Sequence, residues 1–208
     1  EIIIAIPSAS PEALSKIVEI CYQTNCRVRR LPTLAHVVEG KLTASIRDVS
    51  YEDLLSRKPV ESDLPGLRDI LRGKTILVTG GGGSIGSELC RQIASFEPSR
   101  LVLLDSSEFA LYRIDEELAQ TRPRLVRSCW AGDVRDAERV AEIITAERPA
   151  VVFHAAAYKH VPLMETSPEE AIKNNVFGTL NVSEAAHKYE TEKFILISTD
   201  KAVNPTNI

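Results

Sequence analysis

A glycine-rich run between an apolar strand and an amphipathic helix constrains this chain more than any other feature. The run Thr79-Gly80-Gly81-Gly82-Gly83-Ser84-Ile85-Gly86 follows the apolar stretch 75–78 and precedes a helical pattern over 84–95. Glycine there allows a tight turn, a close approach of the backbone to a pyrophosphate, and close packing of helix on strand. A helix that begins at such a turn offers free N–H groups and its positive dipole end to an anion. The sequence therefore predicts a phosphate-binding turn with contacts from Thr79, Gly80, Gly83, Ser84, Ile85 and Gly86.

Strand-like and helix-like segments alternate through the rest of this region. Short apolar runs predict strands over 75–78, 101–104, 128–131, 151–153 and 194–197. Helical spacing predicts helices over 84–95, 110–119, 137–147 and 176–189, the first with Ile85, Leu89 and Ile93 turned inward. Strands separated by helices of this length favour right-handed crossovers. The predicted fold class is α/β, with a Rossmann-type, doubly wound parallel sheet that we expect to be truncated.

The first third of the chain carries a weaker pattern of the same kind. Strand-like runs over 1–6 and 28–31 flank a helix that Ser10 caps, and a weak strand is expected over 42–46. Proline, glycine and polar residues gathered between 59 and 66 indicate a linker. We therefore predict the C-terminal part of an N-terminal α/β domain over 1–58, a linker over 59–72, and a truncated dinucleotide-binding domain over 73–208.

Charge and hydropathy exclude several classes of protein. The net charge of −4 argues against a nucleic-acid partner, because neutralising phosphates requires a clustered surplus of lysine and arginine. No apolar run reaches the about 18 residues that a membrane helix needs, so a membrane attachment is expected only in segments outside this sequence. The four cysteines lack a metal-binding spacing, and we expect no metal and a cytoplasmic location.

Two aspartates follow the second and third strands of the glycine-turn region. Asp105 comes 19 positions after Gly86, where a carboxylate can accept hydrogen bonds from the adenosine ribose of a dinucleotide. It would repel a 2′-phosphate, and no arginine adjoins it, so the sequence favours NAD over NADP. The alternative is an aspartate that only caps the next helix. Asp133 and Val134 fit an adenine contact, or else a turn at the start of a helix.

Longer motifs resemble a known family. The pattern Thr79-x-x-x-Gly83-x-x-Gly86, with Asp133, Ala155-Ala156-Ala157 and Asn175-x-x-Gly178-Thr179, resembles the extended short-chain dehydrogenase/reductase superfamily. The runs His154-Ala-Ala-Ala-Tyr-Lys-His-Val-Pro162 and Ser198-Thr-Asp-Lys-Ala-Val-Asn-Pro205 are similar to those of CapD-like polysaccharide-biosynthesis proteins, the UDP-N-acetylglucosamine 4,6-dehydratases. The resemblance covers about 73–208. The first third resembles the extra α/β domain of the long, membrane-anchored members, and the chain is expected to be a fragment of such a protein.

The resemblance implies a redox-neutral loss of water from a UDP-sugar. Bound NAD takes a hydride from sugar C4, a base removes the C5 proton, an acid protonates the departing C6 hydroxyl, and the hydride returns to C6. By motif, Thr199 would bond the C4 hydroxyl, Asp200 would be the acid and Lys201 the base. Lys201 must then be neutral and Asp200 protonated, which needs a poorly solvated site. Without the resemblance, these residues are interpreted as a surface turn.

The resemblance also implies roles for the loop after the fourth strand of this region. Ala155, Ala156 and Ala157 are expected beside the ribose and nicotinamide of the cofactor, and Ser198 is expected to contact the cofactor as well. The alternative for the alanines is helix–sheet packing. Lys159 and His160 are expected to contact the substrate, with a solvated loop as the alternative.

Two other functions stay open at this point: an NAD-dependent nucleotide-sugar epimerase, and a non-catalytic dinucleotide-binding module. The resemblance is compatible with a homo-oligomer at the inner face of a bacterial plasma membrane. The sequence leaves undetermined the sugar, the C5 stereochemistry, and whether Tyr or Met stands in the family's x-x-x-Lys motif.

Overall fold

The computed structural model describes residues 1–6, 9–24, 26–30, 47–48 and 64–199. The chain divides into two compact units, Glu1–Ser62 and Asp63–Ile208.

The first unit contains a parallel β–α–β piece. Strand β1 (Ile2–Ile4) pairs in parallel with β2 (Val28–Arg30), helix α1 (Pro11–Tyr22) connects them, and β3 (Arg47–Asp48) pairs antiparallel with β2. The core of this piece is apolar and consists of Ile4, Leu14, Val18, Cys21 and Val28. The two predicted strands and the helix between them are confirmed, whereas the weak strand expected over 42–46 lies outside the described residues.

The second unit is built on a five-stranded parallel sheet. Its strands are β4 (Thr75–Thr79), β5 (Arg100–Asp105), β6 (Arg127–Ala131), β7 (Val151–His154) and β8 (Lys193–Leu196). Their order across the sheet is β6-β5-β4-β7-β8, and every pairing is parallel. The chain adds strands on one side of β4 and then crosses to the other side, so the sheet is doubly wound, as predicted.

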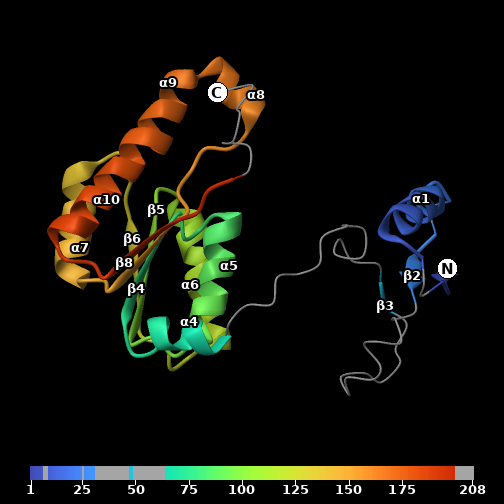
Figure 1. Cartoon of the computed structure of the whole chain (residues 1–208), viewed down its shortest axis with the longest axis horizontal. Coiled ribbons are helices and arrows are strands. Elements are labelled where there is room, and N and C mark those ends of the chain that lie inside the picture. Colours follow the sequence, from blue (N-terminus) through green and yellow to red (C-terminus); the bar gives the residue numbers. More distant parts are fainter. Residues whose placement is uncertain (7–8, 25, 31–46, 49–63, 200–208) are drawn as a thin grey trace. The chain divides into compact units, whose positions relative to one another are not determined.

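Helices cover both faces of this sheet (Figure 1). Helices α5 (Ser84–Ala94) and α6 (Glu108–Thr121) lie on one face, and α7 (Ala137–Glu147) and α10 (Thr179–Lys188) lie on the other. One apolar cluster includes Val78 and Leu103, and a second, on the opposite face, includes Leu77 and Leu104. Successive residues of a strand point to opposite faces, so a sheet covered on both sides needs continuous apolar runs such as those of β4 and β5.

The predicted linker differs from the structure. Helix α4 (Leu64–Leu71) occupies most of the range 59–72, whose first residues lie outside the described ones. Pro65, which favoured the linker interpretation, stands in the first turn of the helix. N–H groups in that turn make no hydrogen bond within the helix, so proline is tolerated there. Leu71 is buried in the core of the second unit, so this segment belongs to that unit's fold.

The helical segment after β7 also begins earlier than the predicted 176. It comprises α8 (Val161–Thr166), α9 (Pro168–Ala171), the π-helix η1 (Ile172–Gly178) and α10. Pro162 and Pro168 each stand in a first helical turn, where proline is tolerated. A π-helical turn has no simple sequence signal, and such turns occur frequently at functional sites.

Candidate functional site

A pocket of about 150 Å³ lies at the carboxyl edge of the parallel sheet. Strands β4 and β7 are neighbours in this sheet, and the chain has reversed its direction of winding between them. Ligands of doubly wound sheets bind outside the carboxyl ends of the strands at such a point. The residues that line the pocket are Gly80, Gly83, Leu104, Asp105, Ser106, Gly132, Asp133, Val134, Ala155, Ala156, Ala157, Tyr158 and Asn174.

The glycine turn closes the pocket on the β4 side, and Gly80, Gly82 and Gly86 are sterically required: a Cβ on Gly82 would stand 2.5 Å from Ala110 Cβ. Gly80 has a φ of +67°, and a Cβ there would come within 2.7 Å of the Ala155 carbonyl oxygen. A Cβ on Gly86 would stand 1.9 Å from the Gly80 carbonyl oxygen. The turn is therefore folded tightly on itself and against the loop after β7, with Gly83 N–H donating to the Gly80 carbonyl at 3.0 Å.

Helix α5 presents an uncapped amino end. Its N-cap is Gly83, which has no side chain to occupy the first N–H groups of the helix. These donors and the helix dipole suit a phosphate group. Ser84 and Ile85 are exposed at this end, and Ile85 is 52% exposed, so the prediction that Ile85 turns inward with Ile93 is wrong. Ile85 stands in the first turn of α5, whereas the apolar side chains that pack on the sheet begin one turn later in the helix.

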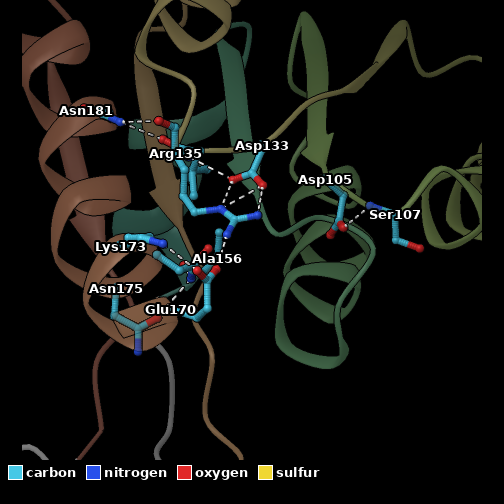
Figure 2. Close-up of polar contacts among 11 residues, drawn as sticks. Asp105, Ser107, Asp133, Arg135, Ala156, Glu170, Lys173, Asn175 and Asn181 are labelled. Carbon is cyan, nitrogen blue, oxygen red and sulfur yellow. Dashed lines mark hydrogen bonds and ion pairs between the residues drawn. The ribbon is translucent and has the colours of Figure 1, made fainter. Parts of the chain in front are cut away.

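Asp105 fastens the glycine turn to the start of α6. Its Oδ2 accepts a hydrogen bond from Gly82 N–H at 2.9 Å, and its Oδ1 accepts one from Ser107 N–H at 2.9 Å. Figure 2 shows Asp105 beside Ser107. The N-cap of α6 is Ser107 and not Asp105. The carboxylate thus lines the pocket while it orients the turn.

Asp133 is bound by an arginine that follows it closely in the sequence. The Arg135 guanidinium contacts both carboxylate oxygens through Nε and Nη2, at 2.6 to 3.0 Å, and Arg135 N–H donates to Oδ1 at 2.9 Å. These hydrogen bonds hold the pKa of Asp133 below its usual value. Arg135 also contacts Glu170 at 2.6 Å, and Lys173 contacts Glu170 at 2.7 Å (Figure 2).

A buried histidine connects three elements beneath the pocket. His154 is 2% exposed; its Nδ1 lies 2.6 Å from Thr79 Oγ1, and its Nε2 lies 2.9 Å from Thr179 Oγ1. Thr179 donates its own proton to the Asn175 carbonyl at 2.7 Å, so His154 Nε2–H donates to Thr179 and Nδ1 accepts from Thr79. Burial lowers the pKa of His154 to about 4, so the ring is neutral at pH 7.

Two asparagines of the π-helix hold the loop after β7. Asn174 donates to the Ala156 carbonyl at 3.3 Å. Asn175 accepts from Tyr158 N–H at 2.8 Å and donates to the Tyr158 carbonyl at 2.9 Å. On the next helix, Asn181 donates to the carbonyls of Val134 and Arg135 at 3.0 and 3.1 Å. The pocket's wall opposite the glycine turn is therefore fixed by side-chain amides.

The structure brings many of the predicted cofactor residues into one pocket. Those that line it are Gly80, Gly83, Asp105, Asp133, Val134, Ala155, Ala156 and Ala157. Thr79 is fully buried beneath the pocket, and Gly86 packs inside the turn. Lys159 and His160 are exposed on the loop after Tyr158. Ser198 and Thr199 are exposed after β8, whereas Asp200 and Lys201 lie outside the described residues.

Sequence reasoning missed several lining residues and the histidine beneath them. Leu104, Ser106, Gly132, Tyr158 and Asn174 also line the pocket. Gly132 directly follows the predicted third strand of this region, and that position could have indicated a pocket residue. The role of His154 could not be predicted in this way, because its partners are far from it in the sequence. Within the described part of the chain, no helix has the length and apolarity to span a bilayer, and no group of three or more metal-ligating side chains occurs.

Known proteins similar in sequence span this chain and extend beyond it. The capsular polysaccharide biosynthesis protein CapD of Staphylococcus aureus is 45% identical over 210 residues, which cover 100% of this chain and 35% of that protein. The membrane protein MJ1061 of Methanocaldococcus jannaschii is 50% identical over 142 residues, 68% of this chain and 41% of that protein. An inverting UDP-N-acetylglucosamine 4,6-dehydratase of Campylobacter jejuni is 35% identical over 140 residues, which cover 67% of this chain and 40% of that protein.

Solved structures share the fold of the second unit. Pen from Bacillus thuringiensis superposes with a TM-score of 0.62 at 32% identity, covering 66% of this chain and 42% of that one. The UDP-glucose 4-epimerase of Bifidobacterium longum, solved with NAD+ and UDP, gives a TM-score of 0.55 at 26% identity. The superposition covers 62% of this chain and 38% of that one.

The family model described as polysaccharide biosynthesis protein matches residues 76–208, which include the glycine turn, the pocket and, apart from Thr75, the five strands of the second sheet. The chain spans about a third of the length of its CapD relative. It belongs to the CapD-like polysaccharide biosynthesis protein family, which is related to NAD-dependent nucleotide-sugar dehydratases and epimerases.

Proposed function

We propose that this chain is the NAD-binding part of a nucleotide-sugar 4,6-dehydratase that converts UDP-N-acetylglucosamine to its 4-keto-6-deoxy product for surface polysaccharide synthesis. The observation that carries the proposal is the pocket, in which an uncapped helix end, a glycine turn and Asp105 meet at the carboxyl edge of the sheet. The 35% identity to a UDP-N-acetylglucosamine 4,6-dehydratase supports the choice of reaction. Because the chain spans only part of its relatives, the activity belongs to the intact protein.

The residues of the pocket fit a dinucleotide. A Cβ on Gly80 would collide with the opposite wall, so only glycine permits this turn geometry, and the amino end of α5 offers donors for a pyrophosphate. Gly83, Ser84, Ile85 and Gly86 form that end. The Asp105 carboxylate would accept from ribose hydroxyls and repel a 2′-phosphate, which favours NAD over NADP. Bound NAD would supply a transient hydride acceptor for the sugar.

The residues assigned to the sugar chemistry come from the run after β8. Strand β8 is parallel to β7, so its carboxyl end at Leu196 lies on the same edge of the sheet as the glycine turn. Ser198 would approach the cofactor, and Thr199 would bond the C4 hydroxyl. Asp200 would protonate the departing C6 hydroxyl and Lys201 would remove the C5 proton. Lys159 and His160 would contact the UDP-sugar, and Ala155 to Ala157 would let the backbone approach the cofactor.

An NAD-dependent UDP-sugar 4-epimerase is the second candidate. The fold shared with the Bifidobacterium longum epimerase favours it. Its chemistry changes only the configuration at C4, so it does not need an acid at C6 paired with a base at C5. The Asp200–Lys201 pair therefore supports dehydration over epimerisation.

Residues 1–58 would be the end of an additional N-terminal α/β domain. The intact protein would act as a homo-oligomer at the cytoplasmic face of the plasma membrane, attached through segments outside this chain. The similarity to the membrane protein MJ1061 supports the attachment to a membrane.

The test uses the full-length protein, loaded with NAD and incubated with UDP-N-acetylglucosamine. Mass spectrometry is expected to show a product that has lost one water. Asp200→Asn and Lys201→Ala should each abolish this loss while NAD stays bound, and Lys193→Ala, at the opposite end of β8, should leave it unchanged. A product of unchanged mass with inverted C4 would establish the epimerase instead. Near-normal dehydration by either active-site variant would refute the assigned roles.

A further inference from the structure

The loop after β7 carries the proposed UDP-sugar contacts, and it forms neither helix nor strand. Residues 155–160 connect β7 to α8, and Lys159 and His160 are exposed on this loop. Ordering a loop and a long side chain on binding costs free energy, so a lysine there contributes most when the backbone that carries it is already fixed. The contribution of Lys159 therefore depends on what fixes this loop.

The helical segment after β7 fastens the first half of the loop. His154, the last residue of β7, donates from Nε2 to Thr179 Oγ1 at 2.9 Å. Two residues later, the Ala156 carbonyl accepts from Asn174 Nδ2 at 3.3 Å. Asn174 is buried on the π-helix η1, and π-helical turns occur frequently at functional sites. The loop is thus tied to η1 and α10 as far as Ala156.

Asn175, also on η1, holds the second half of the loop. Its Oδ1 accepts from Tyr158 N–H at 2.8 Å, and its Nδ2 donates to the Tyr158 carbonyl at 2.9 Å. One side-chain amide therefore makes the pair of hydrogen bonds that a neighbouring strand would make. Asn175 is itself fixed, because its Oδ1 also accepts from Asn174 at 3.0 Å and its carbonyl accepts from Thr179 Oγ1 at 2.7 Å.

Lys159 lies between two fixed backbone positions. On one side, Tyr158 is bound by Asn175 and lines the pocket. On the other side, the His160 carbonyl accepts from Leu163 N–H at 3.1 Å at the start of α8. The backbone of Lys159 is therefore held at the rim of the pocket, although the residue is exposed.

We propose that Asn175 is a positioning residue of the sugar site: by fixing Tyr158, it presents Lys159 to the diphosphate of the UDP-sugar. This inference rests on the proposed function and deepens it, because it names the group that the loop recognises. A lysine ammonium binds a phosphate group as a point charge. The diphosphate is remote from the carbons that react, so this contact is equally strong in the ground state and the transition state. Its loss should raise KM without lowering kcat.

The experiment uses the full-length protein, with saturating NAD in the kinetic assays. It measures kcat and KM for UDP-N-acetylglucosamine, the inhibition constant of UDP, and the dissociation constant of NAD. Asn175→Ala should raise KM about tenfold, the effect of losing one charge-assisted hydrogen bond, and leave kcat within about twofold. The inhibition constant of UDP should rise in parallel, because UDP carries the same diphosphate. The dissociation constant of NAD should stay at its wild-type value.

A double-variant cycle shows whether Asn175 acts through Lys159. Lys159→Ala removes the contact itself and should raise KM at least as much as Asn175→Ala does. The double variant should have the KM of Lys159→Ala, because the loop then has no lysine to present, whereas independent structural effects would multiply. Asn175→Asp keeps the size of the side chain but turns an oxygen toward the Tyr158 carbonyl. It should also raise KM, and it tests the inference if the alanine variant does not fold.

A matched control removes a side-chain amide elsewhere. Gln92 donates to Glu88 at 2.9 Å on the exposed side of α5, so Gln92→Ala should leave both KM and kcat unchanged. A wild-type KM in a folded Asn175 variant would overturn the inference. A multiplied KM in the double variant, or weaker NAD binding with an unchanged KM, would overturn it as well. Should the wild type not dehydrate UDP-N-acetylglucosamine, the proposed function itself fails, and the inference with it.

Discussion

Both units of this chain contain a parallel β–α–β element, but the amino end of the connecting helix is capped in the first unit and uncapped in the second. In both, two parallel strands flank one helix: β1 and β2 flank α1, and β4 and β5 flank α5. At the start of α1, Ser10 caps the N–H of Ala13, and Pro11 has no N–H to satisfy. At the start of α5, Gly83 provides no side-chain cap. The first helix end is closed by its own residues and the second is left open.

The third helical residue shows the same contrast. In α1 this residue is Ala13, which is exposed, and in α5 it is Gly86, where a Cβ would meet the Gly80 carbonyl oxygen at 1.9 Å. A compact glycine turn and a free helix end occur together only in the second element. The β–α–β topology is common to both units, so the proposed phosphate contact depends on the turn that precedes the helix.

The largest expected effect comes from adding a methyl group at the third residue of α5. Gly86→Ala should destabilise the second unit by about 3 kcal/mol, because the methyl group meets backbone that cannot move without opening the turn. NAD binding should be lost with it. Thermal unfolding and titration calorimetry measure the two effects.

The control exchanges the same two residue types in the first unit. Ala13→Gly should cost at most about 1 kcal/mol, the difference in helix propensity, and leave NAD affinity unchanged. Wild-type NAD affinity in Gly86→Ala would show that the two helix starts do not differ as described.

A second contrast concerns the interiors of the units. The described core of the first unit is wholly apolar, whereas the second buries Thr79, His154 and Asn174. The pKa of His154 is about 4 in the folded protein, against about 6.5 in an unfolded chain. The unfolded chain binds the proton more readily, so this contribution to stability is complete above pH 6.5 and is lost as the pH falls towards 4. It amounts to about 3 kcal/mol at most.

This prediction is tested by unfolding the protein with denaturant between pH 4 and 8. His154→Phe should flatten the pH dependence and lower the free energy of unfolding at pH 8 by about 1 to 3 kcal/mol, because it leaves the buried Thr79 hydroxyl without its acceptor. His187→Gln, which removes an exposed histidine of α10, should keep the wild-type pH profile. An unchanged profile in His154→Phe would mean that another group titrates.

The smallest effects come from exchanging the caps. Gly83→Ser would place a hydroxyl on the first N–H groups of α5 and should weaken NAD binding about tenfold, since one donor is withdrawn from the phosphates. Ser10→Ala should lower the stability of the first unit by about 1 kcal/mol without changing NAD affinity. Equal NAD binding by Gly83→Ser and the wild type would show that phosphates do not use this helix end.

Several features of the fold and the pocket could be predicted because their causes are local in the sequence. The glycine turn, Ser10 as a cap, and the apolar runs of β4 and β5 each depend on neighbouring residues, and the structure has all of them. Helix α4 was missed because Pro65 and Gly66 suggest a linker when the buried position of Leu71 is unknown. Ile85 was assigned to the wrong face because helical spacing alone does not show where contact with the sheet begins.

The sequence by itself determined an α/β chain with a parallel sheet and a glycine turn before the first helix of that sheet, because hydrophobic period, glycine placement and capping act over a few residues. Only the tertiary structure decided that His154 bridges Thr79 and Thr179, and that Arg135 contacts Glu170. In the sequence, His154 is 75 residues from Thr79 and 25 residues from Thr179, and Arg135 is 35 residues from Glu170. Such contacts form only when the sheet order brings distant strand ends together, and no local pattern in the chain encodes that distance.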